Sequence, residues 1–144
     1  MAGDYEGALR DIVSYWGGML SMGATTFWED FDLKWLENAA PIDAPVPEGK
    51  VDIHGDYGAY CYIKFRHSLC HGWASGPCPY LPQYVLGIKA VSPDTYEVKP
   101  ELSYLDWAEG TFPTPAGIIS VSAKKVNGET VTEISAPEGI TIIR

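Results

Sequence analysis

The sequence predicts an α+β protein, with helices in the first part of the chain and strands in the second. Apolar residues recur with helical spacing up to Ile88, and from Ser92 they alternate with polar residues as in half-buried strands. With 144 residues, 46% of them apolar, the chain is long enough to bury a core. We therefore expect two domains, residues 1–88 and residues 89–144.

The charge of the chain excludes some classes of partner. The formal net charge is -9, and acids outnumber bases in both halves. Nucleic-acid phosphates and anionic membrane surfaces attract clustered Lys and Arg, so we expect neither as a partner. A neutral or cationic ligand is favoured. No apolar run approaches the ~20 residues of a membrane span, and no signal-peptide pattern opens the chain, so the sequence predicts no compartment.

The first helix is predicted from an amphipathic stripe that follows Asp4, a suitable N-cap. Gly23 is expected to end it. The stripe begins so close to Met1 that we expect this helix to belong to a longer protein. The apolar residues of the stripe are Tyr5, Ala8, Leu9, Ile12, Val13 and Trp16.

A short helix is predicted within residues 30–37, followed by a long connection over residues 39–66. The aromatic residues of its later part favour an ordered lobe that carries Asp52, His54 and Asp56, folded over a cleft. The alternative is a solvated turn whose Asp side chains cap backbone N–H groups. The aromatic residues are Tyr57, Tyr60, Tyr62 and Phe65.

The last helix is predicted from Pro77, which suits a first helical turn, to Gly87, which can close the end. Its apolar side has helical spacing and extends to Ile88. The residues of that side are Tyr80, Leu81, Tyr84, Val85 and Ile88.

Five strands of an antiparallel unit are predicted in the remainder of the chain. Asn127-Gly128 is a strong hairpin signal, and Pro137-Glu-Gly139 is a second turn. A unit of fewer than sixty residues buries little apolar surface by itself, so we expect it to pack against other parts of the protein. The strands are expected at residues 96–99, 104–108, 118–122, 131–134 and 140–143.

The stretch from Gly23 to Asp30 contains the most specific chemical signal, because small and hydroxylated residues lead to Trp28 and the carboxylate of Glu29. Gly and β-branched Thr are poor helix formers, and such a stretch suits a loop that approaches a ligand. The alternative is an N-cap at Thr25 or Thr26 with Glu29 as its capping-box partner.

Three cysteines cannot all pair with one another, and their spacing matches no common zinc pattern. We expect buried free thiols. A metal site with His71 between Cys70 and Cys78 is the less favoured alternative. The cysteines are Cys61, Cys70 and Cys78.

Taken together, these stretches resemble the C-terminal end of the α-L-rhamnosidases and related inverting glycoside hydrolases. The resemblance runs through nearly the whole chain in one order. It implies the closing helices of an (α/α)6 barrel in residues 1–88 and a β-sandwich in residues 89–144, with a large N-terminal portion of the enzyme outside this sequence. The stretches that carry it are Gly23–Glu29, Ser68–His71, Leu86–Ile88 and Glu109–Pro115.

The resemblance implies that Glu29 is the general base and that His71 lies at the sugar-binding subsite. Trp28 and Trp73 are candidate sugar platforms, since an aromatic ring can face the apolar side of a sugar; the alternative for each is a place in the core. The expected substrate is a carbohydrate, and no cofactor is expected.

Two departures from the family pattern bear on the sugar and on activity. Asp30, Phe31 and Cys70 replace residues that members commonly carry beside the base and the His. The family's general acid lies upstream, so we expect the 144 residues alone to be inactive. The alternatives are a non-catalytic carbohydrate-binding or interaction module in residues 89–144, and a scaffold that self-associates through exposed helix faces.

Overall fold

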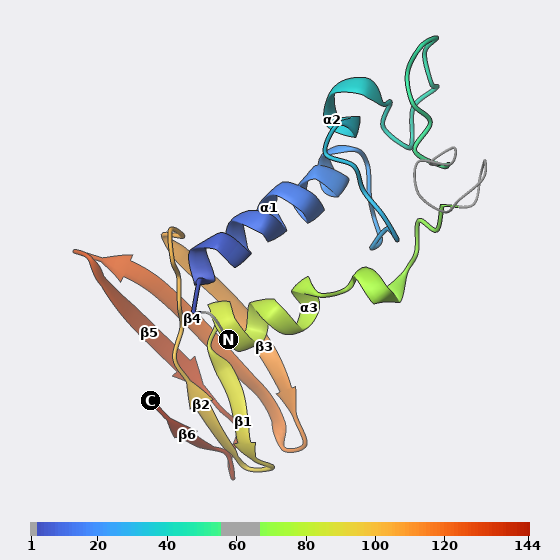
Figure 1. Ribbon diagram of the computed structural model, residues 1–144. Coiled ribbons are helices and arrows are strands. Elements are labelled where there is room, and N and C mark those ends of the chain that lie inside the picture. Colours follow the sequence, from blue (N-terminus) through green and yellow to red (C-terminus); the bar gives the residue numbers. More distant parts are fainter. Residues whose placement is uncertain (1–2, 56–66) are drawn as a thin grey trace. The chain divides into compact units, whose positions relative to one another are not determined.

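The computed structural model describes residues 3–55 and 67–144 and divides the chain into two compact units (Figure 1). Gly7–Gly76 form the first, called here the helical unit. Met1–Glu6 with Pro77–Arg144 form the second, the strand unit. Residues 77–88 thus group with the strands, although the sequence-based boundary was placed after them.

The first helix, α1 (Tyr5–Ser21), is confirmed at both ends. Gly23 terminates it with a positive φ of 92°. The Gly23 N–H bonds the Leu20 carbonyl (3.1 Å) and the Ala24 N–H bonds the Met19 carbonyl (3.0 Å), which is the Schellman arrangement. The chain therefore leaves α1 in a defined direction, at the start of the Glu29 stretch.

Among its described residues, the helical unit has little other regular structure. Its remaining described elements are α2 (Trp35–Asn38), a single turn that overlaps the end of the predicted helix and extends one residue past it, and the 3-10 turn η1 (Gly72–Ala74). An aromatic-rich cluster packs the unit. Its buried members are Met19, Met22, Ala24, Trp28, Phe31, Trp35 and Ile53.

The helix predicted from Pro77 is present as α3 (Pro77–Tyr80), which continues into the π-helical turn η2 (Leu81–Val85). Gly87, with φ 68°, ends it. The prediction was wrong at Ile88, which is the first residue of a strand and pairs with Val98. Helical spacing at this position is accidental, because the positive φ at Gly87 stops the helix before the last apolar residue.

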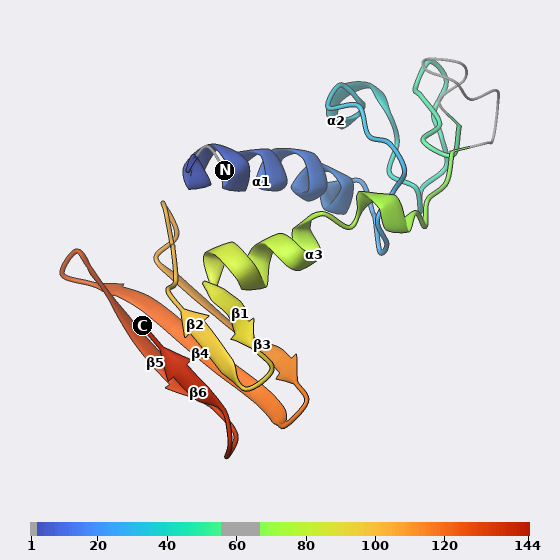
Figure 2. The same ribbon diagram turned by 60° about the horizontal axis from the view of Figure 1, so that its bottom comes forward.

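Two three-stranded sheets follow, which confirms the α+β class (Figure 2). One sheet has the order β1-β2-β6 and the other β3-β4-β5. Neighbouring strands pair antiparallel except β2 and β6, which pair in parallel. The prediction of an antiparallel unit was therefore wrong for β6. The strands are β1 (Ile88–Ser92), β2 (Thr95–Val98), β3 (Trp107–Thr114), β4 (Gly117–Val126), β5 (Glu129–Ser135) and β6 (Thr141–Ile143).

Both predicted turns are confirmed. Asn127 (φ 51°) and Gly128 (φ 86°) join β4 to β5, with Val126 directly opposite Glu129. Two positive φ values in a two-residue loop define the type I′ hairpin that Asn-Gly favours. The second turn places Gly139 at φ 85°.

The two sheets share one hydrophobic core. Val98 and Ile88 from the first sheet cluster with Ile119 and Val121 from the second, together with Leu86 from the end of the helical segment. This shared core explains why residues 77–88 group with the strands.

Other sequence-based expectations concern the surface of the molecule. Cys70 and Cys78 are free but exposed, so the expectation of burial was wrong for both. Cys61, Asp56, Tyr57, Tyr60, Tyr62 and Phe65 lie outside the described residues. Within the described ranges, no helix has the length and apolar content needed to cross a membrane.

We predict that Gly87→Ala strongly destabilises the strand unit. A Cβ at this position would lie 1.8 Å from the Lys99 carbonyl oxygen, a backbone atom that cannot move away alone. We expect a loss of about 3 kcal/mol or more in urea unfolding followed by circular dichroism. Gly128→Ala is the matched control, because its φ is also positive but nothing lies within 4 Å of its Cβ; about 1 kcal/mol is expected there. Equal losses would contradict the steric argument.

Candidate functional site

Two segments far apart in the sequence lie against each other in the helical unit, namely residues 26–30 and residues 67–71. Backbone hydrogen bonds link them in antiparallel fashion, and the Thr26 hydroxyl adds a bond to the Leu69 carbonyl. Two of the four stretches that carry the family resemblance therefore meet in space. The backbone bonds run from the His71 N–H to the Phe27 carbonyl (2.7 Å) and from the Glu29 N–H to the Ser68 carbonyl (2.8 Å).

The Glu29 carboxylate lies at the surface of this junction. Its Oε1 is 4.0 Å from Nδ1 of His71, and its Oε2 accepts a hydrogen bond from the Ser68 N–H (3.2 Å). The side chains of Glu29 and His71 are 20% and 34% exposed. One carboxylate oxygen is thus held by the backbone, while the other faces the imidazole.

This geometry suits proton transfer at a partly exposed position. An ionised carboxylate that remains open to solvent can accept a proton from a water molecule. An imidazole beside it can donate or accept a hydrogen bond with a ligand hydroxyl, since either ring nitrogen can serve. Glu29 and His71 are therefore brought together in a chemically useful way.

Trp28 lies in the core of the helical unit, where it has no exposed surface. Its ring packs on Phe31 and on His67, at centroid distances of 6.1 and 6.3 Å. Among the described residues, its Nε1 has no hydrogen-bond partner. With both ring faces covered by protein, Trp28 anchors the loop in the core, and we do not include it among the ligand contacts proposed below.

Trp73, in contrast, is 95% exposed in η1. Trp16 Nε1 donates a 2.8 Å hydrogen bond to the Ala74 carbonyl, which ties this turn to α1. An indole displayed on a tethered turn two residues after His71 remains a candidate sugar platform.

His67 is a site residue that sequence reasoning missed. It is 8% exposed, and both of its ring nitrogens are engaged. Nδ1 lies 2.8 Å from the Ile53 carbonyl, and Nε2 accepts a hydrogen bond from the Asp30 N–H (3.2 Å). No local pattern marks it, because these partners are 14 and 37 residues away in the sequence.

The two hydrogen bonds of His67 determine its tautomer. A carbonyl can only accept, so Nδ1 carries the proton, and Nε2 must be unprotonated to accept from the Asp30 N–H. The ring also packs on Trp35 at 5.6 Å. A neutral, buried imidazole therefore holds the residue that follows Glu29 in place.

Asp30 and Phe31, two of the departures from the family pattern, are held by Tyr15 of α1. The Phe31 N–H donates to the Tyr15 hydroxyl (2.9 Å), and that hydroxyl donates to Oδ1 of Asp30 at 3.5 Å. Oδ2 of Asp30 is buried and has no hydrogen-bond partner in the described ranges. Asp30 therefore faces inward at the position next to Glu29.

Asp52 and His54 match the solvated-turn alternative. Asp52 Oδ1 accepts from the His54 N–H (3.1 Å) and lies 2.7 Å from His54 Nδ1, at an exposed position. In the described parts of the chain, no three or more His, Cys, Asp or Glu residues are grouped so as to hold a metal ion.

Comparison with protein-family models finds no match, and comparison with curated proteins finds no relative. The family assignment accordingly rests on the sequence stretches named above and is carried forward as a proposal.

We predict that His67→Ala loosens the loop that carries Glu29. It would leave the Ile53 carbonyl and the Asp30 N–H unpaired and open a cavity beside Trp28 and Trp35, a loss of about 2–4 kcal/mol. Amide hydrogen exchange at Glu29, whose N–H bonds Ser68, should accelerate accordingly.

The matched control is His54→Ala, which removes an exposed histidine paired with Asp52. It should change protection at Glu29 by less than about 1 kcal/mol. Unchanged protection at Glu29 in His67→Ala would show that the imidazole does not hold this loop.

Proposed function

We propose that this chain supplies the general base, Glu29, of an inverting glycoside hydrolase that resembles the α-L-rhamnosidases and acts on terminal α-L-rhamnosides or a related sugar. The observation that carries the proposal is the junction of two of the resembling stretches, Gly23–Glu29 and Ser68–His71, where the Glu29 carboxylate lies 4.0 Å from His71 and stays partly exposed. Neither stretch by itself requires this arrangement.

The proposed chemistry needs a carboxylate in the place of Glu29. In an inverting glycosidase, an ionised carboxylate deprotonates a water molecule that attacks the anomeric carbon, while a protonated acid on the opposite face donates to the leaving group. The Ser68 N–H bond to Oε2 stabilises the charged form and orients the group. Oε1, which lies 4.0 Å from Nδ1 of His71, is the oxygen that would accept the proton from water.

His71 and Trp73 would contribute to sugar binding rather than to proton transfer. His71 can hydrogen-bond a hydroxyl of the sugar, and the exposed Trp73 indole can cover an apolar sugar face. Oδ2 of Asp30 is buried and Oδ1 accepts a hydrogen bond from the Tyr15 hydroxyl, so this carboxylate is poorly placed to act as the opposing acid. The acid would come from polypeptide outside these 144 residues.

At the level of the fold, we propose that the helical unit is the closing part of an (α/α)6 barrel and that the two sheets are a β-sandwich. The ending of α1 at Gly23, directly before the loop of Glu29, supports the first proposal, because barrel active sites are built from loops between helices. The core shared by the two sheets supports the second.

We predict that the purified 144-residue chain does not hydrolyse an aryl α-L-rhamnoside, whereas a protein extended through the upstream reading frame does. In the extended protein, Glu29→Gln should lower kcat by about 10²–10⁴-fold with little change in KM, because Gln keeps the size but cannot accept the proton.

Glu37→Gln, at an exposed position in α2, is the matched control and should leave kcat unchanged. Full activity of Glu29→Gln would overturn the assignment of the base, and turnover by the 144 residues alone would overturn the proposal that the acid lies outside them.

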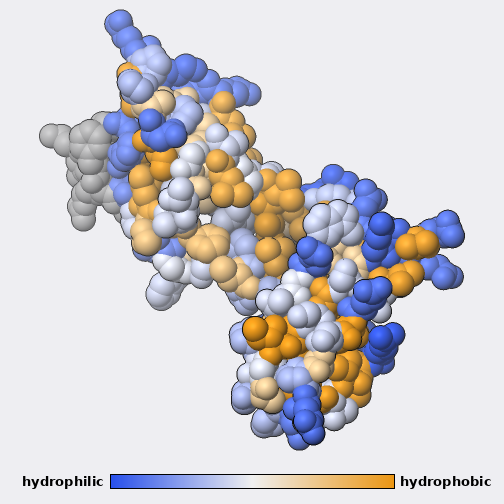
Figure 3. All heavy atoms as spheres, turned by 180° about the vertical axis from the view of Figure 1, so that it is seen from behind, coloured by the Kyte–Doolittle hydropathy of each residue, from blue (hydrophilic) through white to orange (hydrophobic). Residues whose placement is uncertain are grey.

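We also propose that the chain self-associates through α1, with a second copy as the partner. Val13 and Leu20 are more than half exposed and lie seven residues apart, which places them on the same side of the helix. Apolar side chains on the surface form patches between hydrophilic ones (Figure 3). Exposed apolar faces of this kind favour association.

We predict that light scattering detects a species larger than the monomer and that Leu20→Lys shifts the population toward monomer. Val91→Lys, at an exposed apolar position in β1, is the control and should not change the distribution. A strictly monomeric wild-type chain would contradict the proposal.

A further inference from the structure

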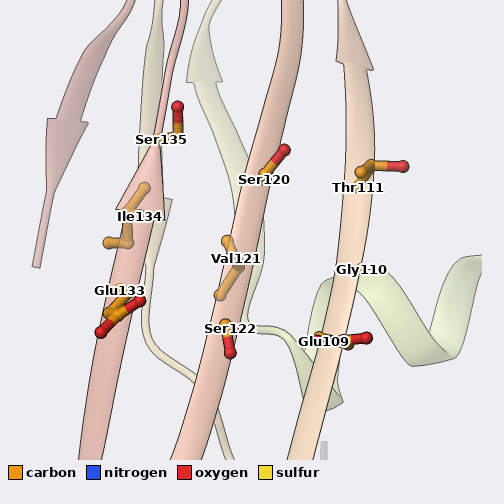
Figure 4. Close-up of a pocket in the computed structure, with 9 residues that line it drawn as sticks. All are labelled: Glu109, Gly110, Thr111, Ser120, Val121, Ser122, Glu133, Ile134 and Ser135. Carbon is orange, nitrogen blue, oxygen red and sulfur yellow. The ribbon is translucent and has the colours of Figure 1, made fainter.

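A groove of about 570 Å³ crosses the β3-β4-β5 sheet on the face turned away from the shared core (Figure 4). Its floor is the backbone of three directly paired residues, Gly110, Val121 and Ile134. The Val121 and Ile134 side chains belong to the hydrophobic core on the other face. The volume lies within the ~300–1,000 Å³ of small-molecule sites.

Two rows of polar side chains form the walls of this groove. Each row takes one residue from each strand, in register across the sheet, and all of these residues are exposed. Because side chains two apart on a strand share a face, both rows project from the groove side. The first row is Glu109, Ser122 and Glu133, and the second is Thr111, Ser120 and Ser135.

The polar groups of both rows are available to a ligand. In the part of the chain that the structure describes, no protein group hydrogen-bonds to these six side chains. Together they offer two carboxylates, which only accept when ionised, and four hydroxyls, which both donate and accept. Such a set matches a ligand that carries several hydroxyl groups.

An exposed indole extends the same face. Trp107 is two residues before Glu109 on β3, so it lies ~7 Å further along the strand on the groove side. It is 59% exposed. Exposure of a large, flat, apolar ring to water is unfavourable. Such a ring can stack on the C–H face of a ring-shaped ligand whose edges are polar.

We propose that this groove is a second carbohydrate-binding site, which takes a neutral pyranose sugar with its hydroxyls between the two polar rows and its apolar face toward Trp107.

Charge and geometry argue against other ligands. Glu109 and Glu133 repel anions such as phosphates. They lie on the two outer strands, about 10 Å apart, which is too far to share one metal ion whose ligand distances are about 2–2.6 Å. A ligand that bound only through its positive charge would use the two carboxylates and would leave the hydroxyls between them without a partner. The open groove predicts weak binding, with a Kd on the order of 1 mM.

This site is independent of the proposed catalytic site. The groove lies entirely in the strand unit, whereas Glu29 and His71 lie in the helical unit. Sugar binding here would keep a polysaccharide or glycoside near the protein without any role for Glu29. Failure of one proposal therefore leaves the other intact.

The test is an NMR titration of the ¹⁵N-labelled 144-residue chain with methyl α-L-rhamnoside, D-galactose and D-glucose, each up to ~100 mM, about a hundred times the expected Kd. At least one sugar should cause saturable shifts in amides of residues 109–111, 120–122 and 133–135. The double variant Glu109→Gln, Glu133→Gln and the single variant Trp107→Ala should each weaken binding at least ~5-fold.

Two control variants test whether a loss of binding reflects the groove itself. One removes a negative charge elsewhere in the strand unit, and the other changes the proposed base. Glu138→Gln, in the turn before β6, and Glu29→Gln should both leave the groove shifts unchanged. Spectra of all variants show directly whether each is folded.

Three outcomes would overturn the groove as a sugar site. The first is the absence of saturable shifts there with all three sugars. The second is undiminished binding in the folded double variant. The third is saturation of the groove by spermidine but by no sugar, which would show a cation site instead. Shifts confined to residues 27–30 and 67–71 are an instance of the first outcome, and they would support the site at Glu29.

Discussion

The arrangement of the candidate site depends on one buried imidazole. His67 hydrogen-bonds the Ile53 carbonyl and the Asp30 N–H, and its ring packs between two tryptophans of the core. The residue after it, Ser68, then meets Glu29 in two hydrogen bonds. Because backbone N–H and C=O groups that are buried must find partners, this bridge lets three irregular segments share a core with the last turns of α1.

The neighbours Trp28 and Glu29 show how that bridge produces a usable carboxylate. Trp28 is wholly buried against His67, while Glu29 reaches the surface beside His71. The large apolar side chain provides the anchoring, and the next residue is the proposed general base. A carboxylate on a loop without such an anchor would sample many positions, and proton transfer requires hydrogen-bond geometry within a few tenths of an ångström.

Elements with a local physical cause could be predicted. The apolar stripe and Gly23 define α1, and Asn127-Gly128 defines the β4–β5 hairpin, because each depends on residues within a few positions. Ile88 was assigned to a helix and β1 was missed, because Ile88 pairs with Val98, which is ten residues away in the sequence. The parallel pairing of β6 with β2 and the exposure of Cys70 also depend on packing that no local pattern encodes.

The sequence by itself determined the α+β class, the ends of the first helix, the Asn-Gly hairpin and the choice of Glu29 and His71 as candidates. Only the tertiary structure decided that these two side chains meet, that Trp28 is core while Trp73 is exposed, that His67 joins three segments, and that polar residues on three strands line one groove. The physical reason is range: backbone conformation and periodicity act over a few residues, whereas hydrogen bonds and packing between distant segments exist only in the folded chain.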